Sequence, residues 1–121
     1  MSAETVGPAR GDEPLFPMPP VSEAPLRAAV RRLDPAEAVR FEQEFHSAWE
    51  EALLSDSTVP MHTFLHRWAV FVALRRRPAR AARLRELERA VGQAETRAEA
   101  RVAAAGISAL LDEAAAEVAA A

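Results

Sequence analysis

The sequence predicts an all-α fold: a small bundle of four to five helices with a disordered, proline-rich N-terminal tail. Apolar residues recur at three- and four-residue steps over several segments, and this spacing aligns them on one face of a helix. No segment alternates apolar and polar residues for long enough to indicate a strand. Half of the 121 residues are apolar, which suffices for one domain with a modest core.

The N-terminus has the composition of a tail. From Arg10 to Pro20, four prolines, a glycine and two acids surround the few large apolar residues, which are Leu15, Phe16 and Met18. Such a segment buries too little apolar surface to offset the entropy lost on ordering. We therefore expect residues 1–21 to be a disordered tail and residues 22–121 to form a single helical domain.

Two of the expected helices begin with clear start signals. Asp34, Pro35 and Glu37 combine an N-cap acid, a first-turn proline and a capping glutamate. Thr96 and Glu99 form a second capping box before the last helix. Together with the apolar periodicity, these signals predict five helices, over residues 24–33, 35–54, 60–76, 78–91 and 97–121.

Apolar stripes on these helices predict the core. The third helix is the most hydrophobic and should be the centre of the fold, with Met61, Phe64, Leu65, Trp68, Phe71 and Val72 facing inward. The second helix should bury Ala38, Phe41, Phe45, Ala48, Trp49, Ala52 and Leu53. The stripe of the last helix is mostly small, so we expect its distal part, residues 114–121, to fray or to depend on a partner.

Charge is segregated along the chain although the net charge is only -3. Between Asp34 and Asp56, seven acids face the single base Arg40. Between Arg75 and Arg89, seven arginines face only two glutamates. The two segments either pair with each other or present surfaces of opposite charge to partners.

No group of residues is typical of a catalytic or cofactor site. The chain contains no cysteine, which excludes disulfides and thiolate chemistry. His62 and His66 are four residues apart, as two ligands of one metal ion can be, but a third ligand and an intervening catalytic acid are missing. We therefore expect a protein that is not an enzyme and has no cofactor and no metal. Because no signal peptide or transmembrane run is evident, we expect it to be cytoplasmic, without membrane contact.

Several short motifs resemble an uncharacterised family of short helical proteins from GC-rich bacteria. The similarity covers roughly residues 26–91 and rests on Leu33-Asp34-Pro35, Trp49-Glu50-Glu51-Ala52, Phe64-Leu65-His66-Arg67-Trp68, Arg77-Pro78-Ala79 and Leu84-Arg85-Glu86-Leu87. Members of that family are often encoded beside toxins of the RelE/ParE class. The resemblance implies an antitoxin-like binding role and defines no functional residue.

The sequence thus favours a protein-binding module, in its most concrete form an antitoxin-like inhibitor of a small basic toxin. The alternative is a regulator that binds DNA or RNA through the basic segment from Arg75 to Arg89. The small-residue stripe of the last helix would also permit a homodimer. The candidate partner-binding residues are Glu37, Glu44 and Glu51 on the acidic helix and Arg75, Arg76, Arg77, Arg80 and Arg83 in the basic segment.

Overall fold

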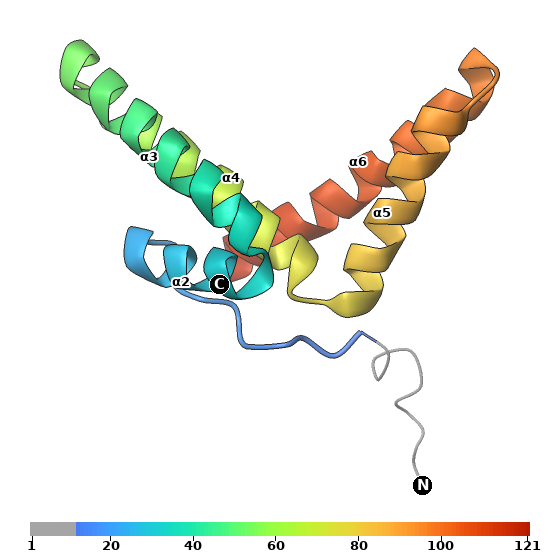
Figure 1. The fold of residues 1–121 in the computed structure, drawn as a ribbon, viewed down its shortest axis with the longest axis horizontal. Helices are drawn as coiled ribbons and strands as arrows, with labels where there is room; N and C mark the ends of the chain where they lie inside the picture. The colour runs from blue at the N-terminus through green and yellow to red at the C-terminus, as the bar shows by residue number, and fades with distance from the viewer. Residues whose placement is uncertain (1–11) are drawn as a thin grey trace, which may run out of the picture.

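The computed structural model describes residues 12–121, and this part of the chain is all-α, as the sequence predicts. Figure 1 shows a V in which two helices form each arm, and a shorter helix lies across the base of one arm. In chain order, the described helices are α2 (Glu23–Leu33), α3 (Pro35–Ser55), α4 (Val59–Arg75), α5 (Pro78–Gln93) and α6 (Arg97–Ala120). The arms are the α3–α4 hairpin and the α5–α6 hairpin.

Local sequence signals set most of the helix boundaries. The Asp34 side chain accepts a hydrogen bond from the Ala36 N–H at 3.0 Å, and Pro35 follows it at the first helical position. The Thr96 hydroxyl accepts from the Glu99 N–H at 3.1 Å, whereas the Glu99 carboxylate accepts from the Glu95 N–H at 2.9 Å instead of from the Thr96 N–H, so half of the second capping box forms as predicted. At the start of α4, the N-cap residue is Thr58, and its side chain makes no capping hydrogen bond.

An aromatic cluster joins α3 to α4 at the centre of the fold. The rings of Phe64 and Trp68 meet that of Phe41 edge-on, at centroid distances of 4.9 and 5.3 Å. Phe41 is fully buried, and Phe64 and Trp68 nearly so. Edge-on aromatic pairs stabilise a core beyond the area they bury. The prediction that α4 supplies the densest apolar stripe is therefore confirmed.

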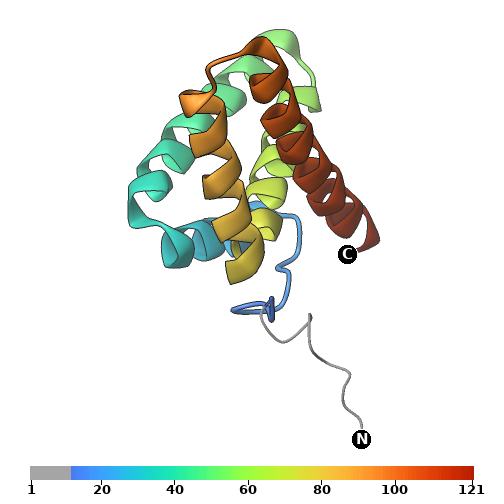
Figure 2. The same ribbon diagram turned by 90° about the vertical axis from the view of Figure 1, so that its right-hand side faces the viewer.

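The last helix differs from its prediction. Its distal part is well packed, because α6 passes from the tip of its own hairpin down to the base of the V and lies against α4 there (Figure 2). Ala114 and Val118 are both buried in the core. Closer to the tip, Gly106 allows a close approach to α5, since a Cβ there would lie 2.9 Å from a Leu87 methyl carbon.

The N-terminal segment also differs from its prediction over the residues that the structure describes. Residues 12–21 lie along the base of the V, whereas residues 1–11 of the expected tail lie outside the described part. The Leu15 N–H donates to the Arg76 carbonyl at 2.7 Å, and the half-buried Phe16 packs against the core. Asp12 caps α5 although it is far from this helix in the sequence. Its carboxylate accepts a hydrogen bond from the Arg80 N–H at 3.1 Å.

The expected stripe of α3 is buried over only part of its length. Phe41 and Ala48 are buried, but Trp49 is 51% exposed and Leu53 is 66% exposed. The cause is the length of α2, which has 11 residues against the 21 of α3 and so covers only the first half of its neighbour. Among the helices of residues 12–121, none combines the length and the hydropathy needed to cross a membrane.

Candidate functional site

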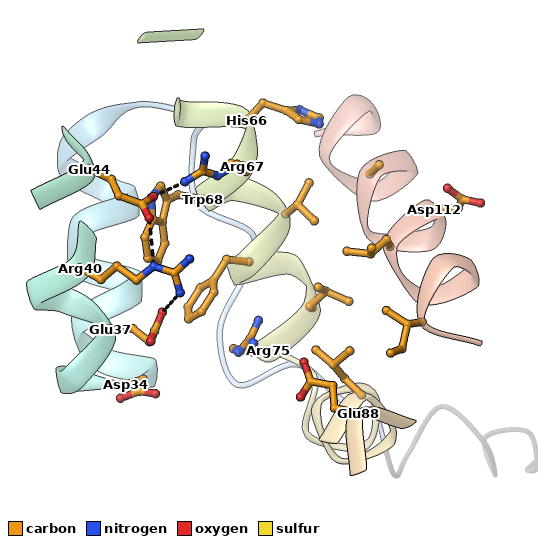
Figure 3. A pocket seen from close by; sticks show the side chains of 17 residues that line it. Asp34, Glu37, Arg40, Glu44, His66, Arg67, Trp68, Arg75, Glu88 and Asp112 are labelled. Carbon is orange, nitrogen blue, oxygen red and sulfur yellow. Dashed lines mark hydrogen bonds and ion pairs between the residues drawn. The ribbon is translucent and has the colours of Figure 1, made fainter. Parts of the chain in front are cut away.

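The two arms enclose a groove of about 660 Å³. Figure 3 shows its walls, formed by α3 and α4 on one side and by α6 on the other, with α5 closing one end. Apolar side chains from three helices form the floor, and they are Val70, Phe71, Leu74, Leu84, Ile107 and Leu111. Leu111 is 41% exposed, so part of this apolar surface faces solvent.

The α3 wall carries a network of charged side chains. Glu44 is bound by Arg40 at 3.0 Å and by Arg67, and it also accepts a hydrogen bond from the Trp68 indole N–H at 3.0 Å. Glu37 lies one turn earlier and pairs with Arg40 at 3.5 Å (Figure 3). The network fixes the wall and links it to the buried aromatic cluster.

The electrostatic environment of Glu44 favours its charged form. Partial burial raises the pKa of this carboxyl, but the hydrogen bonds from Arg40 and Trp68 and the charge of Arg67 together lower it by a larger amount. The resulting pKa lies below the ordinary value of a glutamate. Glu44 is therefore ionised at neutral pH, and its charge is balanced by Arg40 and Arg67.

Arg75 lies in the groove without a carboxylate within ion-pair distance among the described residues. Its guanidinium is placed over the Phe71 ring at 4.1 Å from the centroid, a cation–π contact. Burial lowers the pKa of Arg75, and the neighbouring Glu88, Glu37 and Asp34 charges only partly offset this effect. Even so, an arginine remains charged, so its cation stays available to a ligand.

Three carboxylates on the rim have no ion pair among residues 12–121. Asp34 stands at the start of α3, Glu88 on α5 and Asp112 on α6 (Figure 3). Glu88 and Asp112 are both exposed. In total, five carboxylates and three guanidiniums line the groove, which gives it a net negative charge.

The structure brings together only some of the residues predicted to bind a partner. Glu37, Glu44 and Arg75 line the groove. Glu51 lies at a smaller hollow nearer the tip of the α3–α4 hairpin, which shares Glu44 and Arg67 with the groove. The three acids thus follow one side of α3, as their seven-residue spacing predicts.

Most of the basic segment is engaged inside the fold. Glu117 on α6 binds Arg76 at 2.8 Å, Arg77 at 3.3 Å and Arg80 at 3.5 Å, and we call these four residues the Glu117 cluster. Arg83 lies outside it, exposed and paired with Glu86 at 3.1 Å. The described ion pairs therefore join the basic segment to α6 instead of to the acidic helix α3.

The groove combines an apolar floor with charged side chains on its walls and rim. Within residues 12–121, no three histidine, aspartate or glutamate side chains are grouped as metal ligands would be. His66 stands at the mouth of the groove, and His62 is exposed elsewhere on α4. Searches against family models, curated proteins and solved structures gave no match for this chain.

Sequence reasoning missed the contributions of the second arm to the groove. Glu88 lies within the basic segment, where the arginines dominate the pattern, and Asp112 lies on an alanine-rich helix without a run of acids. Leu111 belongs to the apolar stripe of the last helix, yet it is 41% exposed. The signal that could have indicated this side is the run Leu110-Leu111-Asp112, in which an apolar and an acidic residue adjoin on one helix.

Proposed function

We propose that this chain is a protein-binding module that holds a basic amphipathic helix of a partner in the groove between its arms. One observation carries the proposal: an apolar floor is bordered by Asp34, Glu88 and Asp112, none of which has an ion pair among residues 12–121. A helix laid in such a groove would bury its apolar face on the floor and turn Lys or Arg towards the rim.

The character of the lining favours a protein over a small molecule. Pockets for small molecules are mostly apolar, with a few polar groups that orient the ligand. This groove instead carries eight carboxylates and guanidiniums around its floor. A long partner with several charges can satisfy them, and the surplus of carboxylates selects a basic one.

The specific partner that we propose is a small basic toxin, so that the chain acts as an antitoxin-like inhibitor. This step is supported by the family resemblance and by the net charge of -3. Binding of DNA or RNA has weaker support, because Arg76, Arg77 and Arg80 are bound by Glu117 and Arg75 lies on Phe71. The arginines left on the surface of the basic segment are Arg83, Arg85 and Arg89.

A peptide titration tests the groove. The probe is a fluorescein-labelled helical peptide with leucines on one face and arginines on both flanks, and its anisotropy is followed as the protein is added. Glu88→Arg with Asp112→Arg should weaken binding at least about tenfold, because two favourable charges become repulsive. The matched control, Glu86→Arg with Glu95→Arg, makes the same change of charge on residues outside the groove lining. Equal affinity for both double variants would contradict the groove as the binding site.

Co-expression tests the antitoxin-like role separately. If a small basic protein that arrests growth is encoded beside this chain, the wild-type chain should neutralise it and the Glu88→Arg, Asp112→Arg variant should not. If the wild-type chain and the variant both neutralise the toxin, the toxin binds this chain outside the groove. Continued arrest in the presence of the wild-type chain would refute the antitoxin-like role and leave the peptide result standing.

A further inference from the structure

A second surface lies on the side of α3 that faces α2. There, α2 shows how a basic amphipathic helix docks on the acidic hairpin. Its Arg27 lies over the rings of Phe41 and Phe45, at 5.3 and 5.4 Å, and pairs with Glu42 at 3.0 Å. The Glu42 hydrogen bond raises the pKa of Arg27 and lowers that of Glu42, so both groups remain charged.

The surface that α2 covers continues beyond the end of α2. At about 1.5 Å per residue, the 11 residues of α2 span roughly 16 Å and the 21 residues of α3 roughly 31 Å. Trp49 and Leu53 follow Phe45 at four-residue steps and lie in the uncovered half. On α4, the half-buried Met61 and Leu65 pack beside the core in the same half of the hairpin.

The uncovered half repeats the chemistry of the Arg27 site. In that site an aromatic residue is followed directly by a glutamate and, four residues on, by a second apolar residue, as Phe41-Glu42 and Phe45. Eight residues later the pattern returns as Trp49-Glu50 and Leu53. Glu50 is exposed, and its one described partner is His46 at 3.3 Å. Among residues 12–121, no arginine pairs with Glu50 or stacks on the Trp49 ring.

The charge of the hairpin tip selects the occupant. Between Phe41 and His66 the sequence holds five acids and neither Arg nor Lys. A second copy of the same tip would bring like charges together, which opposes association. A helix that carries arginine would instead meet carboxylates and an aromatic face, as Arg27 does.

We propose that Trp49, Glu50 and Leu53 form a docking surface for an arginine-bearing amphipathic helix of a partner protein. Its arginine stacks on the Trp49 indole and pairs with Glu50, while its apolar side chains cover Leu53. Because this surface and the groove have no residue in common, either proposal can be refuted while the other stands. The partner would thus contact the acidic hairpin outside the groove.

A peptide based on α2 tests this surface. The probe is a labelled helix with two copies of the segment Leu26-Arg27-Ala28-Ala29-Val30, held helical by lactam bridges on its far face. Trp49→Ser with Leu53→Ser should weaken binding at least about tenfold, because an exposed aromatic anchor and its apolar neighbour are lost. Glu50→Arg should weaken it too, and added salt should reduce the Glu50 effect. The matched control is Val102→Ser, an exposed apolar residue on α6 that is 74% exposed.

The outcomes are distinct. Binding that is lost in the Trp49 and Glu50 variants and kept in Val102→Ser and in Glu88→Arg, Asp112→Arg supports the proposal. Equal binding by the wild type and the Trp49→Ser, Leu53→Ser variant overturns it, as does equal binding of a control peptide with Glu in place of both arginines. Sedimentation completes the test: a wild-type dimer that dissociates on Trp49→Ser would show that a second copy is the occupant, and this also overturns the proposal.

Discussion

Replacing Glu117 by Gln should destabilise the fold more than any other single change of an acid. The Arg76 guanidinium is only 5% exposed, and Glu117 Oε1 binds it at 2.8 Å. The same carboxylate neutralises Arg77 and Arg80, which joins the end of α4 and the start of α5 to α6. Its loss leaves Arg76 and Arg77 without a counter-charge and Arg80 with only the exposed Glu113, at 3.7 Å.

The magnitude follows from the degree of burial. Removing one partner of a buried ion pair costs about 3–5 kcal/mol, because the remaining charge is left buried and unpaired. The Glu117 side chain is 21% exposed, and Gln retains one acceptor oxygen, so we expect about 2–3 kcal/mol. For a domain of this size, that loss lowers Tm by about 10 °C.

The same substitution should change the pH dependence of stability. Burial raises the pKa of Glu117, but the hydrogen bond from Arg76 and the arginine charges lower it by a larger amount. The pKa of this carboxyl therefore lies below the ordinary value of a glutamate. A carboxyl whose pKa is lowered by folding contributes stability above its unfolded pKa and loses it as the pH falls through the folded pKa. The difference in the free energy of unfolding between the wild type and Glu117→Gln should therefore reach its full size at pH 7 and become smaller as the pH falls.

Urea denaturation followed by circular dichroism at pH 7 and pH 3 measures both effects. If Glu117→Gln lowers the free energy of unfolding by less than about 0.5 kcal/mol at pH 7, as a substitution at an exposed site typically does, the proposed role of Glu117 in stability is refuted. A difference that stays constant between the two pH values would refute the electrostatic cause. Glu113→Gln is the matched control, because Glu113 is 61% exposed and lies 3.7 Å from Arg80.

Two further substitutions test the core and the N-terminal segment. Trp68→Ala should cost about 3–5 kcal/mol by thermal denaturation, since it leaves a cavity among packed aromatic rings, and a loss below about 1 kcal/mol would contradict its place in the core. Asp12→Ala should cost about 1 kcal/mol through the lost cap of α5, whereas Glu13→Ala, an exposed neighbour, should leave Tm unchanged. Equal Tm values for the Asp12 and Glu13 variants would show that the segment does not hold α5.

The helices and most of the core could be predicted because their signals are local. Asp34 and Pro35 fix the start of α3, Thr96 caps α6, and the spacing of Phe64, Trp68 and Val72 identifies the buried face of α4. Each of these patterns lies within a few residues of the position that it specifies. Such signals can be read without knowing which helices meet.

The features that could not be predicted depend on contacts distant in the sequence. Asp12 caps a helix 68 positions away, and its own neighbours, which are proline-rich, indicate only a tail. Glu117 looks like one more acid on an alanine-rich helix until α6 brings it to Arg76. The exposure of Trp49 follows from the length of α2, whereas the α3 stripe taken alone predicts burial.

The sequence predicted the candidate site only in part. Glu37 and Glu44 were expected as a free acidic face, yet Arg40 and Arg67 bind them. Reversing the charge of these two glutamates would therefore disturb the hairpin as well as any complex. Glu88 and Asp112 provide a cleaner test, because they are exposed and have no ion pair among residues 12–121.

Methyl NMR during titration with the leucine–arginine peptide is the most direct test of the groove as a partner-binding site. With isoleucine, leucine and valine methyl groups labelled, the signals of Val70, Leu74, Leu84 and Ile107 should shift in the wild type and stay in place in Glu88→Arg, Asp112→Arg. Floor signals that remain unchanged at saturating peptide, while binding persists by anisotropy, would contradict the groove as the binding site.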